Sequence, residues 1–446
     1  MSKHILFFHP YQFLPPNAGN YRRSFQILCG LRALGYRVTV ASIGSNWKTS
    51  GDINADLAAA GLSTKDVHLM DISPAEKTWL GRSYRLFGMA NRTPPDWLIA
   101  RLTEPKRQFH RLLNAVSPDY LFVTYMMADT FIDHERYTIP TMIDSIDLTT
   151  LNRRMWRQLE PCLPGGPISA SQIAPEALEL DYWSRQGLTA DPEEFATYDR
   201  YDQTIAIVQQ EADAIYRNTK RTSVHTIPHM QAPVYQDNTY DADAFLPGGP
   251  NPFNLQGILF FTKHVLPRVL STSPDFCLHI TGPSSQRIAP QSGIRLTPFV
   301  ELKEAYRRAP FLICAAFGGT GQQVKITEAL AHGVPVVALR AAAERSCLRH
   351  GVNGLIADSA EELADHVLTL WNDRRLCRRL GESARQMVAV DLSDQCLLVP
   401  LSRVLMNSQR DAMSRQHPVS MPPSPGLLPE SGRVVTHRDS PEQYPG

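Results

Sequence analysis

Short apolar runs alternate with longer amphipathic segments along the first half of the chain. Residues 4–9 (HILFFH) are apolar, and a Pro- and Gly-rich loop leads from them into an amphipathic segment over residues 21–34 that ends at Gly35. A second apolar run, YRVTVAS, follows at residues 36–42. This order predicts a strand, a helix and a second, parallel strand. Further strands are predicted at residues 67–70, 120–124, 140–143 and 205–208.

The second half of the chain repeats this rhythm after a polar, turn-rich linker over residues 231–250. Helix-forming segments separate the apolar runs. These runs predict strands at residues 257–261, 277–282, 294–299, 311–316 and 334–339. The alternation predicts an α/β fold with two Rossmann-like, doubly wound domains that face each other across a cleft.

Changes in composition set the predicted domain boundaries. We assign residues 1–230 to an N-terminal domain and residues 245–390 to a C-terminal domain. Residues 161–196 begin with a Pro- and Gly-rich stretch and are predicted to form an insertion in the N-terminal domain, as a lid or an acceptor loop. A helical segment is predicted over residues 391–413. The tail, residues 414–446, is rich in Pro, Ser and Gly and is predicted to be disordered.

The composition narrows the classes of function. The 446 residues are 43% hydrophobic, which is enough for two domain-sized cores. The net charge of +1 gives no field that favours a nucleic acid, so no such partner is expected. The seven cysteines form no CxxC pair and indicate free thiols in a reducing compartment. No segment has the pattern of a signal peptide or the ~20 apolar residues of a spanning helix, so we expect a cytoplasmic location.

The glycine-rich loop GGTG at residues 318–321 is the strongest candidate for a ligand site. It joins an apolar strand to a helix, whose amide groups and positive dipole end point toward the loop. Lys325, Glu328 and His332 share one face of that helix. A cation beside a carboxylate suits a nucleoside diphosphate, because Lys neutralises phosphate and Glu accepts hydrogen bonds from ribose hydroxyls. The spacing fits equally well a solvated Lys–Glu pair, and His332 is interpreted as a polar residue at the helix end.

Two common nucleotide-binding motifs are absent from this loop. It lacks the GxxxxGK[ST] pattern of a phosphate-binding P-loop. It also lacks the GxGxxG pattern of dinucleotide-binding proteins, which occurs in the first strand-to-helix turn. Both absences argue against an ATPase and a dehydrogenase.

The motif GxGxxxKIxEALAxGxPVV occupies residues 319–337, with ITGP before it and HGVNG after it. These ordered motifs of residues 245–390 resemble the family-four-like retaining glycosyltransferases of the GT-B fold (glycosyl transferases group 1). The resemblance implies that Glu328 binds the donor ribose. It also implies that Gly319, Thr320, Gly321 and Lys325 contribute to the diphosphate and sugar sites. Many relatives carry a glutamate where this chain has Thr320.

The N-terminal half carries weaker parts of the same resemblance. Gly19 and Arg22 resemble the family's glycine loop and first-helix arginine, which implies contacts to the donor phosphate. They fit equally an ordinary helix start with surface arginines. Asp144 and Asp147 follow an apolar strand and resemble a family segment where acceptor and donor meet. Asp147 is the predicted catalytic carboxylate, although one of the two aspartates fits a helix N-cap as well.

A basic stretch between residues 81 and 111 has two interpretations. Trp97, Leu98 and Leu102 lie among its charges. It suits contact with an anionic membrane surface or an acidic acceptor, and it also suits a solvated helix face, which we favour. Its basic residues are Arg82, Arg85, Arg92, Arg101, Lys106, Arg107 and Arg111.

Together these features predict a hexosyltransferase-type enzyme that moves a sugar from a nucleotide-sugar donor to a glycan, lipid-linked or other hydroxyl acceptor, with retention of configuration. Lys325 and Asp147 are its predicted catalytic residues. No cofactor or metal is expected, and peripheral contact with the inner face of a membrane is kept as an option. The alternatives are a GT-B protein that binds a partner or nucleotide without turnover, and a sugar-nucleotide epimerase of the same fold.

Overall fold

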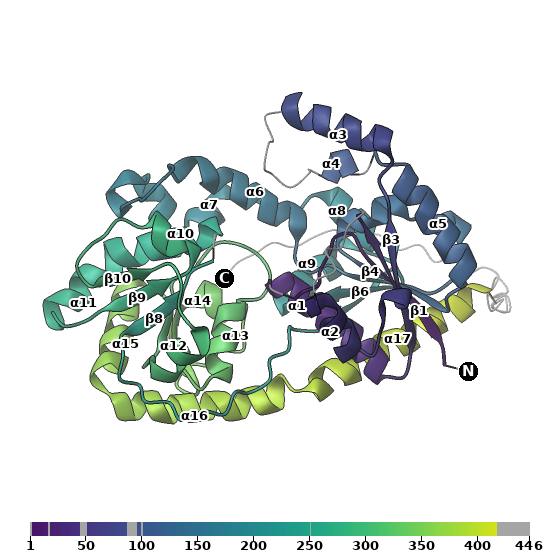
Figure 1. Ribbon diagram of the computed structural model, residues 1–446. Helices are drawn as coiled ribbons and strands as arrows, with labels where there is room; N and C mark the ends of the chain where they lie inside the picture. Colours follow the sequence, from purple (N-terminus) through teal and green to yellow (C-terminus); the bar gives the residue numbers. More distant parts are fainter. Residues whose placement is uncertain are drawn as a thin grey trace, which may run out of the picture.

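The chain folds into two lobes that lie side by side in the computed structural model (Figure 1). The structure describes residues 2–16, 18–44, 51–86, 96–99, 101–249 and 251–416. Each lobe is built around one parallel β-sheet with helices packed on it. The predicted α/β fold with two Rossmann-like sheets is therefore confirmed.

The N-terminal sheet has seven parallel strands in the order β3-β2-β1-β4-β5-β6-β7. Its strands are β1 (His4–His9), β2 (Arg37–Ile43), β3 (Val67–Met70), β4 (Tyr120–Thr124), β5 (Thr141–Asp144), β6 (Gln203–Ala206) and β7 (Ser223–Thr226). Its helices include α1 (Gly19–Ala33), α2 (Gly51–Ala59), α3 (Pro74–Leu86), α5 (Glu104–Val116), α6 (Thr149–Leu159), α8 (Pro192–Tyr198) and α9 (Gln209–Asn218). Strand order reverses between β1 and β4, which creates a crevice at the carboxyl ends of those two strands.

The C-terminal sheet has six parallel strands in the order β10-β9-β8-β11-β12-β13. Its strands are β8 (Ala244–Pro247), β9 (Leu278–Thr281), β10 (Ile294–Thr297), β11 (Leu312–Cys314), β12 (Val336–Leu339) and β13 (Gly354–Ala357). Its helices include α10 (Pro252–Phe260), α11 (Leu266–Thr272), α12 (Leu302–Arg308), α13 (Val324–Ala331), α14 (Arg340–Ala343) and α15 (Ala360–Asn372). Strand β11 lies beside β8, so the switch point of this sheet falls between these two strands.

The predicted strand at residues 257–261 is wrong. These residues lie at the end of α10 and in the π-helical turn Phe261–Val265 that follows it. Pro252 through Phe260 are buried on nearly every side, so the helix is apolar all round and shows no 3.6-residue periodicity. The actual first strand of the C-terminal sheet, β8, lies inside the segment predicted to be a polar linker.

The predicted insertion packs against the C-terminal lobe although it precedes that lobe in sequence. Its apolar residues Ile168, Leu178 and Tyr182 join the core cluster of the C-terminal sheet. Gln256 of α10 donates a hydrogen bond to the Ala177 carbonyl at 2.7 Å. The segment therefore connects the lobes physically.

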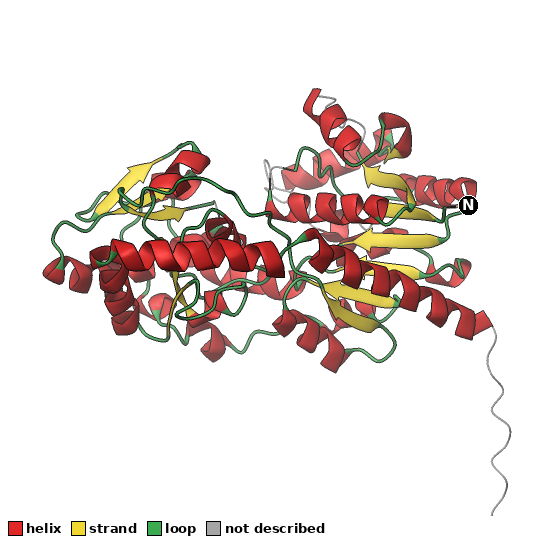
Figure 2. Cartoon of the chain, turned by 90° about the horizontal axis from the view of Figure 1, so that it is seen from below, coloured by secondary structure: helices red, strands yellow, loops and turns green. Residues whose placement is uncertain are grey.

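The last two helices also span both lobes, as the view from below shows (Figure 2). Helix α16 (Arg374–Asp391) covers the C-terminal lobe, and α17 (Asp394–Gln416) returns to the N-terminal lobe. There, the side chains of Leu397 and Leu401 pack over Gly30 of α1. Helix α17 corresponds to the helical segment predicted over residues 391–413 and continues past it to Gln416. The remainder of the predicted tail lies outside the described residues.

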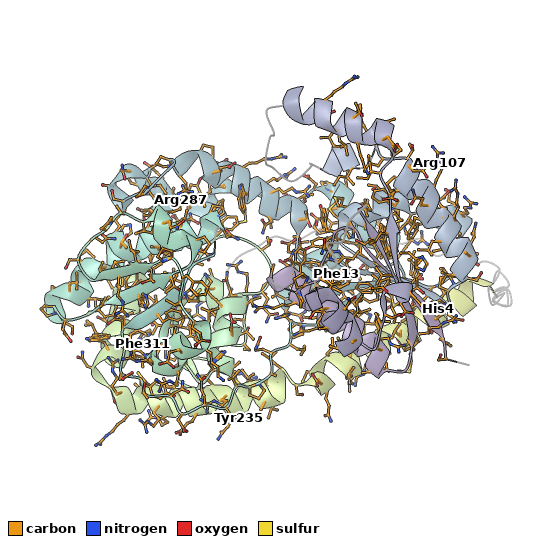
Figure 3. The ribbon with its side chains drawn as sticks, in the orientation of Figure 1. His4, Phe13, Arg107, Tyr235, Arg287 and Phe311 are labelled. Atoms are coloured by element: carbon orange, nitrogen blue, oxygen red, sulfur yellow. The ribbon has the colours of Figure 1, made fainter. Side chains whose placement is uncertain are left out.

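Side chains fill the interior of both lobes, including Phe13 in the first and Phe311 in the second (Figure 3). All seven cysteines are free, as predicted. In the described ranges, no helix has the length and apolarity needed to cross a bilayer.

The basic stretch is only partly visible in the described residues. Arg92 and the side chain of Arg85 lie outside them. Arg107 is exposed at the edge of the N-terminal lobe and forms an ion pair with Glu104 at 3.4 Å (Figure 3). Arg82, Arg101 and Arg111 are also exposed, which agrees with a solvated face.

Candidate functional site

A cleft of about 820 Å³ lies between the lobes. Its floor is made of loops at the carboxyl ends of β8, β9 and β11, where ligands bind in open α/β sheets. Gly248 and Gly249 follow β8, Gly282 follows β9, and the predicted glycine-rich loop follows β11. From the opposite lobe Gly19, at the start of α1, lines the same cleft.

Two positions of the glycine-rich loop have no room for a side chain. Gly319 has a φ of +89°, and a Cβ there would lie 2.8 Å from the ring of Phe253. A Cβ on Gly318 would collide with the indole nitrogen of Trp183. Because Gly318, Gly319 and Thr320 line the cleft, their main chain lies close to any ligand bound there.

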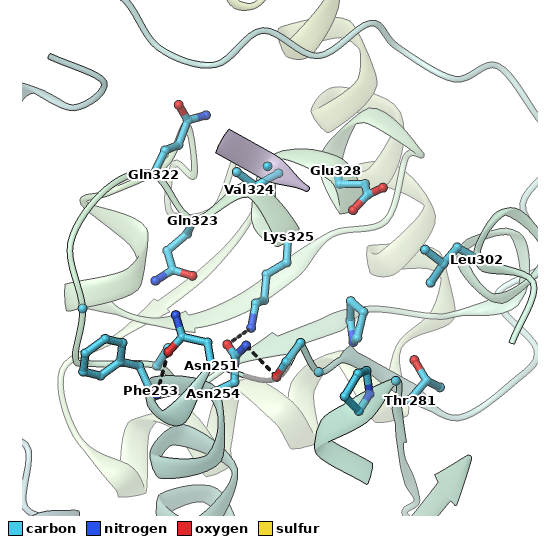
Figure 4. Close-up of a pocket in the computed structure, with 18 of the residues that line it drawn as sticks. Asn251, Phe253, Asn254, Thr281, Leu302, Gln322, Gln323, Val324, Lys325 and Glu328 are labelled. Atoms are coloured by element: carbon cyan, nitrogen blue, oxygen red, sulfur yellow. Dashed lines mark hydrogen bonds between the residues drawn. The ribbon is translucent and has the colours of Figure 1, made fainter. Parts of the chain in front are cut away.

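Lys325 projects from the first turn of α13 into the cleft (Figure 4). Its ammonium group donates a hydrogen bond to the side-chain oxygen of Asn254, and no ion pair with a carboxylate is found for it in the described part of the chain. Burial lowers the pKa of Lys325. A cation held by a neutral amide in a partly dry cleft is suited to an anionic ligand.

Glu328 lies one turn further along α13 and faces the same cleft (Figure 4). Its carboxylate lies 3.6 Å from the guanidinium of Arg22, which reaches across from α1. The Tyr306 hydroxyl lies 3.5 Å from the other carboxylate oxygen. The simple Lys325–Glu328 surface pair is therefore wrong, because each residue contacts a different partner within the cleft.

The structure thus places Gly19, Lys325 and Glu328 in the lining of one cleft, and Arg22 beside Glu328. His332 lies apart from them as the C-cap residue of α13, with its ring stacked on Tyr306 at a centroid distance of 4.6 Å. This agrees with its interpretation as a polar residue at the helix end.

Arg345 lines the cleft and was missed by the sequence analysis. One guanidinium nitrogen donates to the Gly318 carbonyl at 2.9 Å, and another is buried without a hydrogen-bond partner. Burial lowers the pKa of Arg345, and Glu211 in the facing lobe opposes that shift. The residue lies in an irregular segment after α14, where no sequence periodicity marks it.

The two predicted aspartates have different surroundings. Asp144, at the end of β5, is fully buried and receives hydrogen bonds from Arg23 at 2.6, 2.8 and 3.1 Å. Neither aspartate caps α6. The first amides of that helix, those of Thr149 and Thr150, donate instead to Glu194 at 2.8 and 2.9 Å. Asp144 is therefore a partner of a buried ion pair.

Asp147 lies at the boundary between the lobes. It accepts hydrogen bonds from the Thr149 hydroxyl at 3.1 Å and from the Thr320 hydroxyl, in the glycine-rich loop, at 3.4 Å. Burial raises the pKa of its carboxyl to about 6, and the nearby Glu194 charge adds to that shift. At pH 7 it is mostly ionised and available as a hydrogen-bond acceptor.

Glu211, near the start of α9, is a second carboxylate that the sequence analysis missed. It is buried and accepts a hydrogen bond from the amide of Gly321 at 2.6 Å. Burial, and then the charge of Asp147, raises its pKa to about 8. The N-terminal lobe therefore contacts two consecutive residues of the glycine-rich loop, Thr320 and Gly321, through acidic side chains.

Comparison with known proteins agrees with this architecture. Residues 245–373 match the model of a family described as Glycosyl transferases group 1. No match was found among curated protein sequences. The C-terminal lobe is thus similar to the group 1 glycosyltransferases over these residues, and the resemblance inferred from the sequence is confirmed.

Solved structures of the same two-lobed fold cover nearly the whole chain. Sucrose-phosphate synthase from Thermosynechococcus elongatus has a TM-score of 0.61 at 14% identity, covering 92% of this chain and 99% of its own. Anabaena HepE in complex with UDP and glucose has a TM-score of 0.54 at 14% identity, covering 93% and 99%. S. aureus TarM, solved as a mutant with Fondaparinux, alpha-GlcNAc-glycerol and UDP, has a TM-score of 0.56 at 9% identity, covering 92% and 99%. The chain has the fold of the GT-B glycosyltransferases.

Proposed function

We propose that this protein transfers a hexosyl group from a nucleoside diphosphate sugar to a hydroxyl of an acceptor. The observation that carries the proposal is the convergence of Lys325, Glu328 and the glycine-rich loop in one cleft. Lys325 is a half-buried cation with no carboxylate partner among the described residues, which suits a diphosphate, and a carboxylate one helical turn away suits vicinal ribose hydroxyls. The HepE and TarM structures contain UDP, which makes UDP-sugars the first donors to test.

In this proposal the C-terminal lobe holds the donor. Glu328 accepts hydrogen bonds from the ribose, so Arg22 must leave its present pairing and turn toward the diphosphate. Lys325 and the main-chain amides at the start of α13 stabilise the negative charge of the leaving group. Gly19 allows the backbone of the N-terminal lobe to approach the same phosphates.

The proposed transfer breaks the bond between the anomeric carbon and the diphosphate oxygen, which keeps the electron pair. The acceptor oxygen forms the new bond to that carbon, and its proton passes to the Asp147 carboxylate, which accepts the hydrogen bond of that hydroxyl before the transfer. This route delivers the acceptor on the leaving-group face and retains configuration. It needs no metal ion, because the positive charges come from the protein.

A protein that binds the donor without turnover is the second candidate. Thr320 stands where many relatives have a glutamate, and Arg22 engages the proposed ribose carboxylate. An assay for release of free UDP from UDP-glucose, with and without acceptor, separates the candidates. Sustained release identifies an enzyme, and nucleotide binding without release identifies a binding protein.

The direct test is thermal denaturation of the full chain with UDP, GDP, ADP, CMP and their sugars. A ligand at a hundred times its Kd stabilises the folded state by about 2.7 kcal/mol. We expect one nucleotide to raise the melting temperature, and Glu328→Gln to abolish the rise. Glu382→Gln, an exposed change on α16, is the matched control and keeps the rise. If no nucleotide raises the melting temperature, or if Glu328→Gln behaves like the control, the donor site is misassigned.

A further inference from the structure

A second hollow, of about 190 Å³, lies in the N-terminal lobe next to the donor cleft. It lies at the carboxyl ends of three neighbouring strands: Tyr11 follows β1, Tyr125 follows β4 and Asp147 follows β5. This is the point where the strand order of the sheet reverses. Open α/β sheets bind ligands at such points, so the position alone marks the hollow as a candidate site.

Backbone strain is concentrated around this hollow. Tyr125 and Ile146 both have a φ of +65°, a left-handed conformation that non-glycine residues rarely adopt. It is least favourable for the β-branched Ile146. Ile146 directly precedes Asp147, and the main-chain amide of Tyr125 donates a hydrogen bond to the Asp144 carbonyl at 2.9 Å. The strained positions therefore set the placement of the tyrosine ring and the carboxylate in the hollow's wall.

Only one layer of side chains separates the hollow from the donor cleft. Asn152, in the hollow's lining, donates a hydrogen bond to the Thr320 hydroxyl at 2.6 Å, and that hydroxyl contacts Asp147 at 3.4 Å. Thr320 itself lines the donor cleft. A ligand in the hollow thus lies against the same carboxylate that borders the donor.

The lining of the hollow defines a chemical class. Tyr11 and Tyr125 contribute aromatic rings at a centroid distance of 6.0 Å, which suit the C–H faces of a ring. Polar side chains complete the lining: the Asp147 carboxylate accepts hydrogen bonds, the Arg153 guanidinium donates them, and the Asn152 amide can do both. Together they suit a ligand with several hydroxyl groups. Because the charges of Asp147 and Arg153 are opposite, the lining matches a neutral polyhydroxylated ring better than an anion.

We propose that this hollow is the acceptor subsite and binds the terminal sugar ring of a neutral glycan, with the hydroxyl to be glycosylated on Asp147. The inference rests on the proposed function and makes it specific, since it selects a carbohydrate over a lipid or a peptide. The bond changes are those of the transfer given above, with the sugar hydroxyl as the attacking oxygen.

The test measures binding of the purified full chain, in the presence of UDP, to immobilised neutral oligosaccharides that end in glucose, galactose, mannose or N-acetylglucosamine. Anionic oligosaccharides and phosphatidylglycerol vesicles are measured beside them. We expect binding to a neutral glycan, weakened about tenfold or more by Tyr11→Ala, which is the loss of about 1.4 kcal/mol of ring contact. The matched control is Tyr216→Ala, a 72% exposed tyrosine on α9, and it keeps full affinity.

The outcomes separate this inference from the proposed function. If Tyr11→Ala weakens glycan binding but retains the nucleotide-induced rise in melting temperature, the variant is folded and the subsite stands. If Tyr11→Ala and Tyr216→Ala bind glycans equally, or if only anionic glycans or vesicles bind, the inference is overturned. If glycans bind through Tyr11 but no nucleotide stabilises the protein, the sugar subsite stands and the donor function fails. If Tyr11→Ala does not fold, Tyr11→Leu replaces it in the same comparison.

Discussion

Asp144 and Asp147 are three residues apart, and the structure predicts opposite effects when each is changed to asparagine. Asp144 is fully buried and is bonded by the Arg23 guanidinium at distances down to 2.6 Å. Asp144→Asn leaves that guanidinium buried without a counter-ion, since the other hydrogen-bond acceptor found for it among the described residues is the neutral Ile227 carbonyl at 2.7 Å. Breaking a buried pair by removing one partner costs about 3–5 kcal/mol. For a domain of this size the melting temperature then falls by roughly 10 °C.

Asp147→Asn is expected to change the free energy of unfolding in the opposite direction. Its carboxyl has a pKa of about 6, above the ordinary 3.8, so the folded state disfavours the ionised form at pH 7. A neutral amide removes that cost, and the stability changes by between zero and a gain of about 3 kcal/mol. Sugar transfer is lost because the acceptor hydroxyl no longer meets a carboxylate.

The assay is urea unfolding of both variants and the wild-type chain at pH 7, followed by circular dichroism, with transfer measured on the same samples. The buried-pair argument fails if Asp144→Asn loses less than about 1 kcal/mol. The assignment of Asp147 fails if Asp147→Asn is destabilised as much as Asp144→Asn, or if it retains full transfer.

Three further predictions use the same cleft. Lys325→Met should raise the Kd for the bound nucleotide at least about tenfold by calorimetry without lowering the melting temperature, because the lysine is half-buried and no described carboxylate pairs with it. A large loss of stability would contradict this. Gly319→Ala should lower both nucleotide affinity and the melting temperature, because its Cβ would lie 2.8 Å from Phe253, whereas Gly351→Ala, with a φ of +73° and open space around it, pays for backbone strain alone. The pKa of Glu211 is about 8 in the folded protein, against an ordinary value of 4.5, so folding favours the protonated carboxyl. Its stabilising contribution to the free energy of unfolding is therefore complete below about pH 4.5 and is lost as the pH rises through 8. Glu211→Gln should therefore lose less stability than the wild type between about pH 5 and 9, and parallel curves would refute that assignment.

The architecture was largely predictable because the strands of a parallel sheet leave a recognisable pattern in the sequence. Strands such as β4 and β12 are buried on both faces and appear as short apolar runs. The prediction failed where another kind of element gives the same apolar pattern. Helix α10 is buried at every residue except Asn254, and its stretch GILF (257–260) is as apolar as a strand. Strand β8 has only four residues and lies among polar, turn-forming residues. Pattern alone does not separate a buried helix from a buried strand.

The sequence by itself also determined that Lys325 and Glu328 lie side by side, because one helix next to a glycine-rich loop carries both residues. Local spacing determines which face such residues share. It does not determine burial, and only the tertiary structure distinguished Asp144, enclosed with Arg23, from Asp147 at the border of two cavities. Glu211 lies 110 residues before Gly321, whose amide donates a hydrogen bond to it, and it belongs to the other lobe. Arg345 lies 27 residues after Gly318, beyond another strand and helix. Contacts of both kinds depend on how the elements pack in three dimensions, which no local sequence pattern encodes.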